Sequence, residues 1–171
     1  MLKQLADKYR NAFFLWSLHK NPEVRQIVLS ELTEKPENLM LTESFSYQTM
    51  VYLLRKAYII MTDSGGVQEE ASTFHKPLII LRETTERPEV VENGIGFLVG
   101  SDEKKIIKKF SSIYEDNKLY DNIAHTTNPF GDGKASERIR RFFMLDEIKR
   151  FIENFPSSSE ETLNIGGKID V

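Results

Sequence analysis

Residues 58–70 read Tyr-Ile-Ile-Met-Thr-Asp-Ser-Gly-Gly-Val-Gln-Glu-Glu. The apolar start predicts a buried strand, and the small residues Ser64, Gly65 and Gly66 predict a tight turn that opens a helix. Such a turn directs backbone N–H groups and the positive end of the helix dipole outward, where a phosphate can bind. Glycines let a phosphate approach closely, although they can equally serve the geometry of the turn alone.

The rest of the chain alternates strands and helices in the same way. Strands are expected at 12–16, 39–41, 58–61, 77–81 and 96–99; helices are expected at 2–9, 21–32, 47–54, 66–74, 85–93 and 101–113, with a long helix after the turn at 128–133 that runs to about 155. The apolar run at 12–16 is typical of a strand covered on both faces. The alternation predicts an α/β fold, a three-layer Rossmann-like parallel sheet with helices on both faces.

Composition and charge bound the class of protein. With 171 residues and 40% hydrophobic residues, we expect one domain over residues 1–155 and a polar, disordered tail over 156–171. The net charge of −3 lacks the basic footprint of a nucleic-acid binder, and cysteines are absent from the sequence. No apolar run reaches the roughly 20 residues of a membrane span. We therefore expect a cytoplasmic protein with no nucleic-acid or membrane partner, no metal and no cofactor.

Ligands of open parallel sheets bind at the carboxyl ends of the strands, where the loops 19–22 and 82–88 join the glycine turn. Arg87 could neutralise a diphosphate there, or it could be a solvated side chain or a partner for Glu83 or Glu86. His19 could be an acid–base group or a phosphate donor, although a lone histidine is more often structural.

Two carboxylates also follow the glycine turn. Glu70 could bind the two hydroxyls of a ribose, or Glu69 and Glu70 could only complement the helix dipole.

Five collinear blocks of the chain resemble the non-hydrolysing UDP-N-acetylglucosamine 2-epimerases. They are His-Lys-Asn-Pro-Glu-Val-Arg at 19–25, Thr-Asp-Ser-Gly-Gly-Val-Gln-Glu-Glu-Ala at 62–71, Lys-Pro at 76–77, Arg-Glu-Thr-Thr-Glu-Arg-Pro-Glu at 82–89 and Asn-Pro-Phe-Gly-Asp-Gly-Lys-Ala-Ser at 128–136. The resemblance implies two Rossmann-like domains of the GT-B type with the active site between them. It covers the carboxyl-terminal half of a family member, without the first strand of that domain.

The resemblance also implies a role for each candidate residue. The diphosphate would be bound by Ser64, Gly65, Gly66 and Arg87, the ribose by Glu70, and the uracil by Phe45 and Met50. An aromatic residue is usual in the family at the position of Met50, whose thioether can still pack against a base.

The chemistry of the family interconverts UDP-GlcNAc and UDP-ManNAc by anti elimination of UDP, which gives a glycal intermediate, and by re-addition. That isomerase reaction needs a base and an acid on opposite sides of the sugar, and the family carries these carboxylates in its amino-terminal domain. The expected partners are UDP-GlcNAc or UDP, a separate chain that carries the amino-terminal domain, and a further copy of this chain.

Three interpretations remain open from the sequence. The chain is the UDP-binding half of such an epimerase and inactive alone, for example the product of a truncated or split gene. It is a non-catalytic UDP-sugar-binding module or remnant. It is half of a GT-B glycosyltransferase, which the block at 82–89 disfavours.

Overall fold

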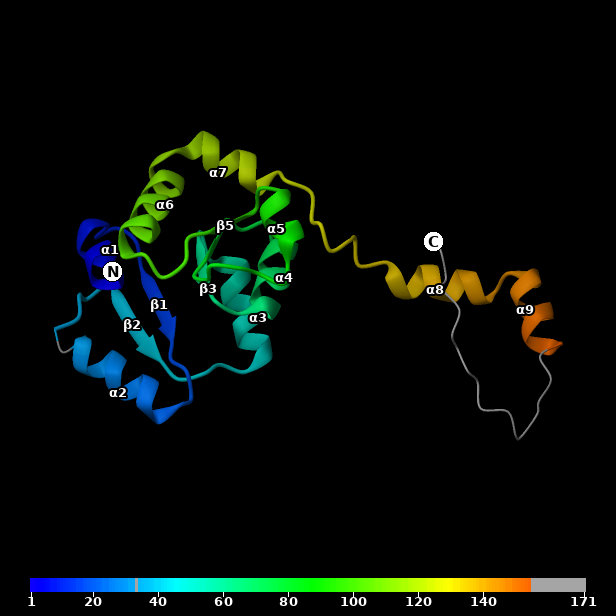
Figure 1. The fold of residues 1–171 in the computed structure, drawn as a ribbon, viewed down its shortest axis with the longest axis horizontal. Coiled ribbons are helices and arrows are strands. Elements are labelled where there is room, and N and C mark those ends of the chain that lie inside the picture. The colour runs from blue at the N-terminus through cyan, green and yellow to red at the C-terminus, as the bar shows by residue number, and fades with distance from the viewer. Residues whose placement is uncertain (33, 155–171) are drawn as a thin grey trace. The chain divides into compact units, whose positions relative to one another are not determined.

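The computed structural model describes residues 1–32 and 34–154 (Figure 1). The strands are β1 (Phe14–Ser17), β2 (Leu39–Thr42), β3 (Ile60–Thr62), β4 (Leu78–Ile80) and β5 (Gly96–Leu98). The helices are α1 (Leu2–Lys8), α2 (Pro22–Glu31), α3 (Tyr47–Lys56), α4 (Gly65–Thr73), α5 (Pro88–Glu92), α6 (Glu103–Glu115), α7 (Asn117–Ala124), α8 (Ala135–Phe143) and α9 (Asp146–Glu153). The predicted alternation of strands and helices is confirmed up to α6, and α7 was not predicted.

The five described strands are all parallel, but they form two sheets. One sheet has the order β1-β2 and the other has the order β3-β4-β5. In register, Phe14 lies opposite Leu39 in the first sheet, and Leu78 lies opposite Ile60 and Gly96 in the second. Where the sequence predicted one sheet, the structure therefore has a break, and the break falls between β1 and β3.

Strand β4 lies at the centre of a three-layer core. Its residues Leu78, Ile79 and Ile80 are all 0% exposed, and they alternate between the two faces as strand side chains do. Ile79 belongs to a cluster with apolar side chains of α1, α6 and α7. Leu78 and Ile80 belong to a second cluster, with side chains of α3, α4 and α5. The helices on both faces of this sheet confirm the predicted α/β class.

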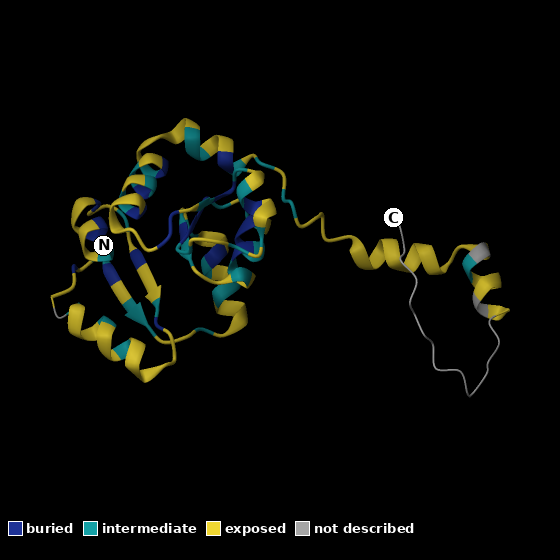
Figure 2. Ribbon diagram, viewed as in Figure 1, coloured by how far each residue is buried: buried dark blue, intermediate teal, exposed yellow. Residues whose placement is uncertain are grey.

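Strand β1 differs from the prediction that it is covered on both faces. Phe14 is buried, but Leu15 and Trp16 are 37% and 36% exposed. The neighbouring helix α2 has no buried residue, and it is coloured as exposed along most of its length in Figure 2. An ion pair joins α2 to Glu43, the residue that directly follows β2. Both Nη atoms of Arg25 donate to the Glu43 carboxylate, at 2.7 and 2.6 Å. The prediction was wrong because α2 does not pack closely on this strand.

The carboxyl-terminal helices also differ from the prediction of one long helix to about 155. Residues 1–130 form one compact unit and the residues from Gly131 form another, which contains α8 and α9. Helix α8 ends because the hydrogen bonding tightens there, with the Leu145 N–H donating to the Phe142 carbonyl three residues earlier at 3.1 Å. The expected end at 155 and the tail 156–171 lie outside the described residues, and the domain boundary at 155 stays a prediction.

Candidate functional site

Helix α4 begins at the glycine turn, directly after β3. Ser64 is its N-cap residue in an extended conformation, and the Ser64 side chain does not cap the helix. The Ser64 N–H instead donates to the Thr62 hydroxyl at 3.0 Å. The first N–H groups of a helix have no partner within the helix. Because α4 begins just after β3, its first N–H groups lie at the carboxyl end of the sheet. The hydroxyl of Ser64 lies beside them.

Neither glycine of the turn is required by the fold. Gly65 and Gly66 are the first residues of α4, and the glycines with positive φ lie elsewhere in the chain. A Cβ on Gly66 would meet no atom within 4 Å, and one on Gly65 would meet only Glu86 Oε2 at 3.9 Å. The backbone geometry that the sequence offered as an alternative explanation therefore does not account for this glycine pair. The surface above the first turn of α4 is open.

Arg87 contacts α4 through an ion pair. Its Nε donates to the Glu69 carboxylate, and its Nη1 donates to the Glu86 carbonyl at 3.0 Å. The hydrogen bond to Glu69 raises the pKa of Arg87 above its ordinary value. Of the partners considered from the sequence, neither Glu83 nor the Glu86 carboxylate holds this guanidinium. It is held by Glu69, one helical turn from the glycine pair.

A partly buried hydrogen bond joins the loop 82–88 to α4. The Thr85 hydroxyl donates to Gln68 Oε1 at 2.6 Å and accepts from the Arg87 N–H at 3.1 Å. Gln68 is 0% exposed. Sequence reasoning missed both residues, although Gln68 lies three positions before the apolar Ala71 and so on the core-facing side of α4. This contact fixes where Arg87 lies relative to the start of the helix.

A second carboxylate lies at the amino end of α4. Arg82 Nη1 donates to Glu86 Oε2 at 2.9 Å, and this hydrogen bond lowers the pKa of the Glu86 carboxyl. The same Oε2 lies 3.9 Å from where a Cβ on Gly65 would be. A negative charge is favoured beside a helix amino terminus, so the carboxylate lies where an anion is stabilised. Glu70 is partly buried on α4, next to Glu69.

The loop after β5 approaches this rim from the other side. The Gly100 N–H donates to the Arg82 carbonyl at 3.1 Å. Gly100 has a φ of +65°, and a Cβ there would collide with the Glu83 carboxylate. Here, unlike at Gly65 and Gly66, the backbone conformation favours glycine, whereas the atoms that a Cβ would meet belong to the end of the exposed Glu83 side chain.

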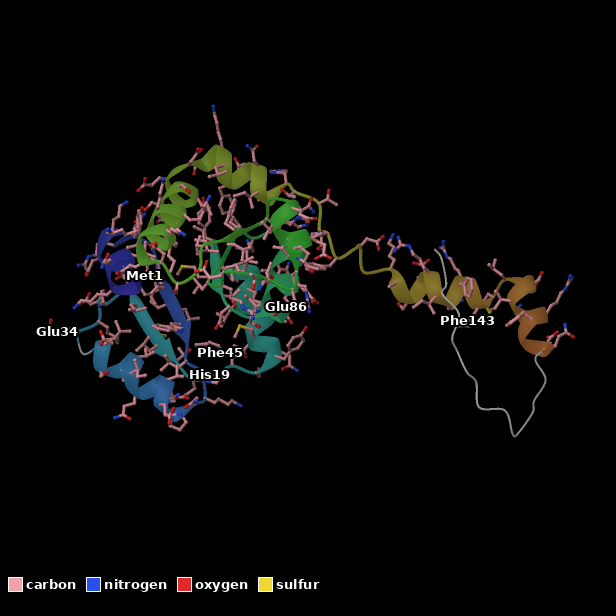
Figure 3. All side chains as sticks on the ribbon, in the orientation of Figure 1. Met1, His19, Glu34, Phe45, Glu86 and Phe143 are labelled. Carbon is pink, nitrogen blue, oxygen red and sulfur yellow. The ribbon has the colours of Figure 1, made fainter. Side chains whose placement is uncertain are left out.

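His19 and Phe45 follow β1 and β2 at the carboxyl end of the smaller sheet, and both are labelled in Figure 3. His19 is exposed, and its Nδ1 accepts the Asn21 N–H at 3.1 Å. Phe45 and Met50 are partly buried and line a cavity of about 1800 Å³. His19 is not among the residues that line it.

The structure therefore separates the predicted site residues into groups. Ser64, Gly65 and Gly66 lie together at the start of α4, with Arg87 held beside that helix by Glu69. Phe45 and Met50 share the large cavity, whose lining reaches Asp63 and Val67 but does not include the glycine pair. Within residues 1–32 and 34–154, no group of three His, Asp or Glu side chains could hold a metal ion, and no helix is long and apolar enough to cross a membrane.

Comparison with known proteins gives consistent matches over most of the chain. A family model described as UDP-N-acetylglucosamine 2-epimerase matches residues 1–144. The UDP-N-acetylglucosamine 2-epimerase of Neisseria meningitidis is 43% identical over 136 residues, which are 80% of this chain and 36% of that protein. The enzyme of the same name from Salmonella borreze is 39% identical over 150 residues, which are 86% of this chain and 39% of that protein.

Solved structures give the same result. The crystal structure of the Neisseria meningitidis UDP-GlcNAc 2-epimerase bound to UDP-GlcNAc has a TM-score of 0.76 and 42% identity, covering 82% of this chain and 38% of that one. The S. aureus MnaA–UDP structure has a TM-score of 0.76 and 35% identity, covering 89% of this chain and 39% of that one. The chain thus spans well under half the length of the relatives it matches.

Proposed function

The chain belongs to the UDP-N-acetylglucosamine 2-epimerase family, and we propose that it is the part of such an enzyme that binds the UDP group of the nucleotide sugar. The start of α4 carries this proposal. It holds two adjacent glycines that neither the backbone conformation nor the packing of the chain requires. A ligand that approaches the helix amino terminus closely would require glycine at these two positions. A diphosphate is such a ligand.

In the proposed complex, the diphosphate accepts hydrogen bonds from the first N–H groups of α4 and from the Ser64 hydroxyl. Arg87 exchanges the Glu69 carboxylate for phosphate oxygens, which its forked guanidinium suits. Glu70 binds the ribose hydroxyls, and Phe45 and Met50 contact the uracil from the cavity that they line. Glu86, which lies at the same helix terminus, moves away from the incoming negative charge.

The reaction that we propose for the whole enzyme is the interconversion of UDP-GlcNAc and UDP-ManNAc, by elimination and re-addition of UDP. A base and an acid must flank the sugar for this reaction. His19 is the histidine at this rim, but it is exposed in the turn after β1, and its Nδ1 accepts the backbone N–H of Asn21. We therefore expect the chain to bind the leaving group and to need acid–base residues from an amino-terminal domain for turnover.

Titration with UDP, followed by thermal unfolding, tests the proposal. We expect UDP to raise the melting temperature of the native protein, because a ligand that binds only the folded state stabilises it. The Gly66→Ala variant is the sharpest comparison. An added methyl group meets no atom of the chain, and alanine favours a helix over glycine, so the variant should unfold at the same or a higher temperature without ligand. It should lose the response to UDP because the methyl group blocks the phosphate.

Arg87→Gln supplies a second variant, with Arg10→Gln as its control. Arg10 pairs with Asp7 at 2.7 Å near the end of α1, in an exposed ion pair far along the chain from the proposed site. We expect Arg87→Gln to weaken UDP binding by about tenfold or more, as loss of a charge-assisted contact does. Arg10→Gln should bind UDP normally. The site assignment fails if UDP does not shift the native protein, or if Gly66→Ala responds to UDP as the native protein does.

An assay of the isolated chain with UDP-GlcNAc separates the UDP-binding part from a complete enzyme. We expect binding without formation of UDP-ManNAc, measured by chromatography of the nucleotide sugars. Turnover by the chain alone would contradict the assignment of the acid–base groups to another domain. Binding by the chain, with no turnover even after an amino-terminal domain is added, would favour the non-catalytic module.

A further inference from the structure

Two arginines of the loop 82–88 pair with carboxylates near the start of α4. Arg87 is held by Glu69, a residue of α4 itself. Arg82 Nη1 donates to Glu86 Oε2 at 2.9 Å, and these two side chains are 37% and 64% exposed. The proposed nucleotide complex gives a role to Arg87 and none to Arg82.

The Glu86 carboxylate, which is labelled in Figure 3, lies near the place proposed for the diphosphate. Its Oε2 is 3.9 Å from the position of a Cβ on Gly65, the first residue of α4. The positive end of the helix dipole favours an anion there. The hydrogen bond from Arg82 lowers the pKa of the Glu86 carboxyl most, and the charge of Arg87 lowers it further. A carboxylate therefore lies beside two cations and a helix amino terminus.

The charges of these two ion pairs match those of a diphosphate. Glu69 and Glu86 each carry one negative charge, and each pairs with one guanidinium. The diphosphate of a nucleotide sugar also carries a negative charge on each of its phosphoryl groups, and a guanidinium binds phosphate oxygens as well as it binds a carboxylate. A diphosphate that replaces both carboxylates therefore keeps both arginines paired. Exchange at Arg87 alone would leave the Glu86 carboxylate beside the bound anion.

The backbone of Arg82 is fixed, whereas its side chain can change partners. Arg82 lies two residues after β4, and its carbonyl accepts the Gly100 N–H at 3.1 Å. The preceding Leu81 N–H donates to the Thr62 carbonyl at 2.9 Å. The guanidinium, by contrast, is held by the exposed Glu86 carboxylate. Exposed ion pairs contribute little to stability, so this pair can open for a ligand at small cost.

We propose that Arg82 is a second phosphate-binding residue, and that the diphosphate displaces Glu86 from it and is then bound by Arg82 and Arg87 together. This inference rests on the proposed function, because it assigns a further residue to the same diphosphate site. Glu86 acts as an internal competitor of the ligand. Loss of the Glu86 charge should therefore tighten binding, whereas loss of the Arg82 charge should weaken it.

Calorimetric titration of the two variants with UDP tests this inference. Arg82→Gln should raise the Kd for UDP by about tenfold or more, as loss of a charge-assisted contact does. Glu86→Gln should lower the Kd by about threefold, the size expected when one exposed ion pair no longer competes. The opposite signs are decisive. If the pair only stabilised the loop, removal of either partner would change UDP binding in the same direction.

Glu83→Gln and Arg10→Gln are the matched controls, since each changes the net charge as one of the two variants does. Glu83 is an exposed carboxylate of the same loop, and its side chain lies beside Gly100. Arg10 belongs to the exposed ion pair with Asp7 near α1. Exposed charges away from the ligand are screened by salt, so both controls should bind UDP within about twofold of the native protein.

Two results would overturn the role of Arg82. Either Arg82→Gln binds UDP as tightly as the native protein does, or Glu86→Gln binds it no more tightly. If Arg87→Gln weakens binding in the same experiment, the nucleotide site at the start of α4 stands and only the role of Arg82 fails. Absence of UDP binding by the native protein would instead remove the proposed function, and this inference with it.

Discussion

Strands β4 and β1 have similar apolar sequences and opposite surroundings. Leu78, Ile79 and Ile80 of β4 are 0% exposed, whereas Leu15 and Trp16 of β1 are more than one-third exposed. Strand β4 has a paired strand on each side and helices above and below, while β1 has one described paired strand and lines the cavity of about 1800 Å³. An apolar sequence thus indicates that a strand can be buried on both faces. Whether it is buried depends on the strands and helices that pack against it.

The largest effect on the free energy of unfolding is expected from a leucine-to-alanine substitution in β4, compared with the same substitution in β1. Leu78→Ala should lower the free energy of unfolding by about 2–5 kcal/mol, because it leaves a cavity in a packed core. Leu15→Ala should cost about 1 kcal/mol, because that side chain is partly exposed and borders a space that already exists. Urea unfolding measures both. Equal losses would show that β1 is as tightly packed as β4.

An intermediate effect is expected at Gly100, in the well-packed half. Gly100→Ala should destabilise the protein by about 1–2 kcal/mol, since alanine at a φ of +65° is strained, while the exposed Glu83 side chain that its Cβ meets can move aside at little cost. Gly94→Ala is the control, because Gly94 has a φ of +78° but no atom within 4 Å of an added Cβ. It should cost about 1–2 kcal/mol, from the backbone alone. The two losses should therefore be similar, and a much larger loss for Gly100→Ala would show that the Glu83 side chain cannot move aside.

The smallest effect is expected where α2 is held by charge rather than by burial. Hydrogen bonds from Arg25 lower the pKa of the Glu43 carboxyl, and the same interaction raises the pKa of Arg25. Because the folded-state pKa of Glu43 is depressed, the contribution of the pair is present above the unfolded value of about 4.3 and is lost as the pH falls through the lower folded value.

Arg25→Gln should return the pKa of Glu43 to its ordinary range and speed amide exchange in α2, with little change in the global urea midpoint. NMR titration of the Glu43 carboxyl measures the first effect. Arg25→Lys keeps the positive charge but loses the forked guanidinium, so the pKa of Glu43 in this variant should lie between its values in the native protein and in Arg25→Gln. A native Glu43 that titrates at its ordinary pKa would contradict the ion pair that holds α2.

Local signals in the sequence predicted the elements well where the deciding residues are close together. The predicted start of α2 is confirmed, with Pro22 in its first turn and the Asn21 side chain accepting the Glu23 N–H at 2.9 Å. The break between α8 and α9 was missed because it lies at Met144 and Leu145, with neither glycine nor proline to mark it. Helix α7 had a usable signal in Asp116, whose carboxylate caps it, and that signal was overlooked.

The family was predicted correctly from the five sequence blocks, and the matches with known proteins confirm it. The contacts of the candidate site were harder to predict because they join segments that are apart in the sequence. Arg87 has acidic neighbours in its own loop, yet it pairs with Glu69 of α4, because Thr85 and the buried Gln68 bring the loop onto that helix. The roles of Ser64, Gly66 and Glu70 toward a nucleotide stay predictions, since they depend on a ligand.

Trp16 is the one tryptophan of the sequence, and it lines the cavity of about 1800 Å³ that Phe45 and Met50 also line. The intrinsic fluorescence of the protein therefore comes from a single indole, at the place where the two sheets separate. A base that enters this cavity would displace water from beside the indole and change its emission, without any label. The emission of Trp16 therefore reports on the uracil end of the proposed site, whereas Gly65 and Gly66 at the start of α4 lie outside the lining of this cavity.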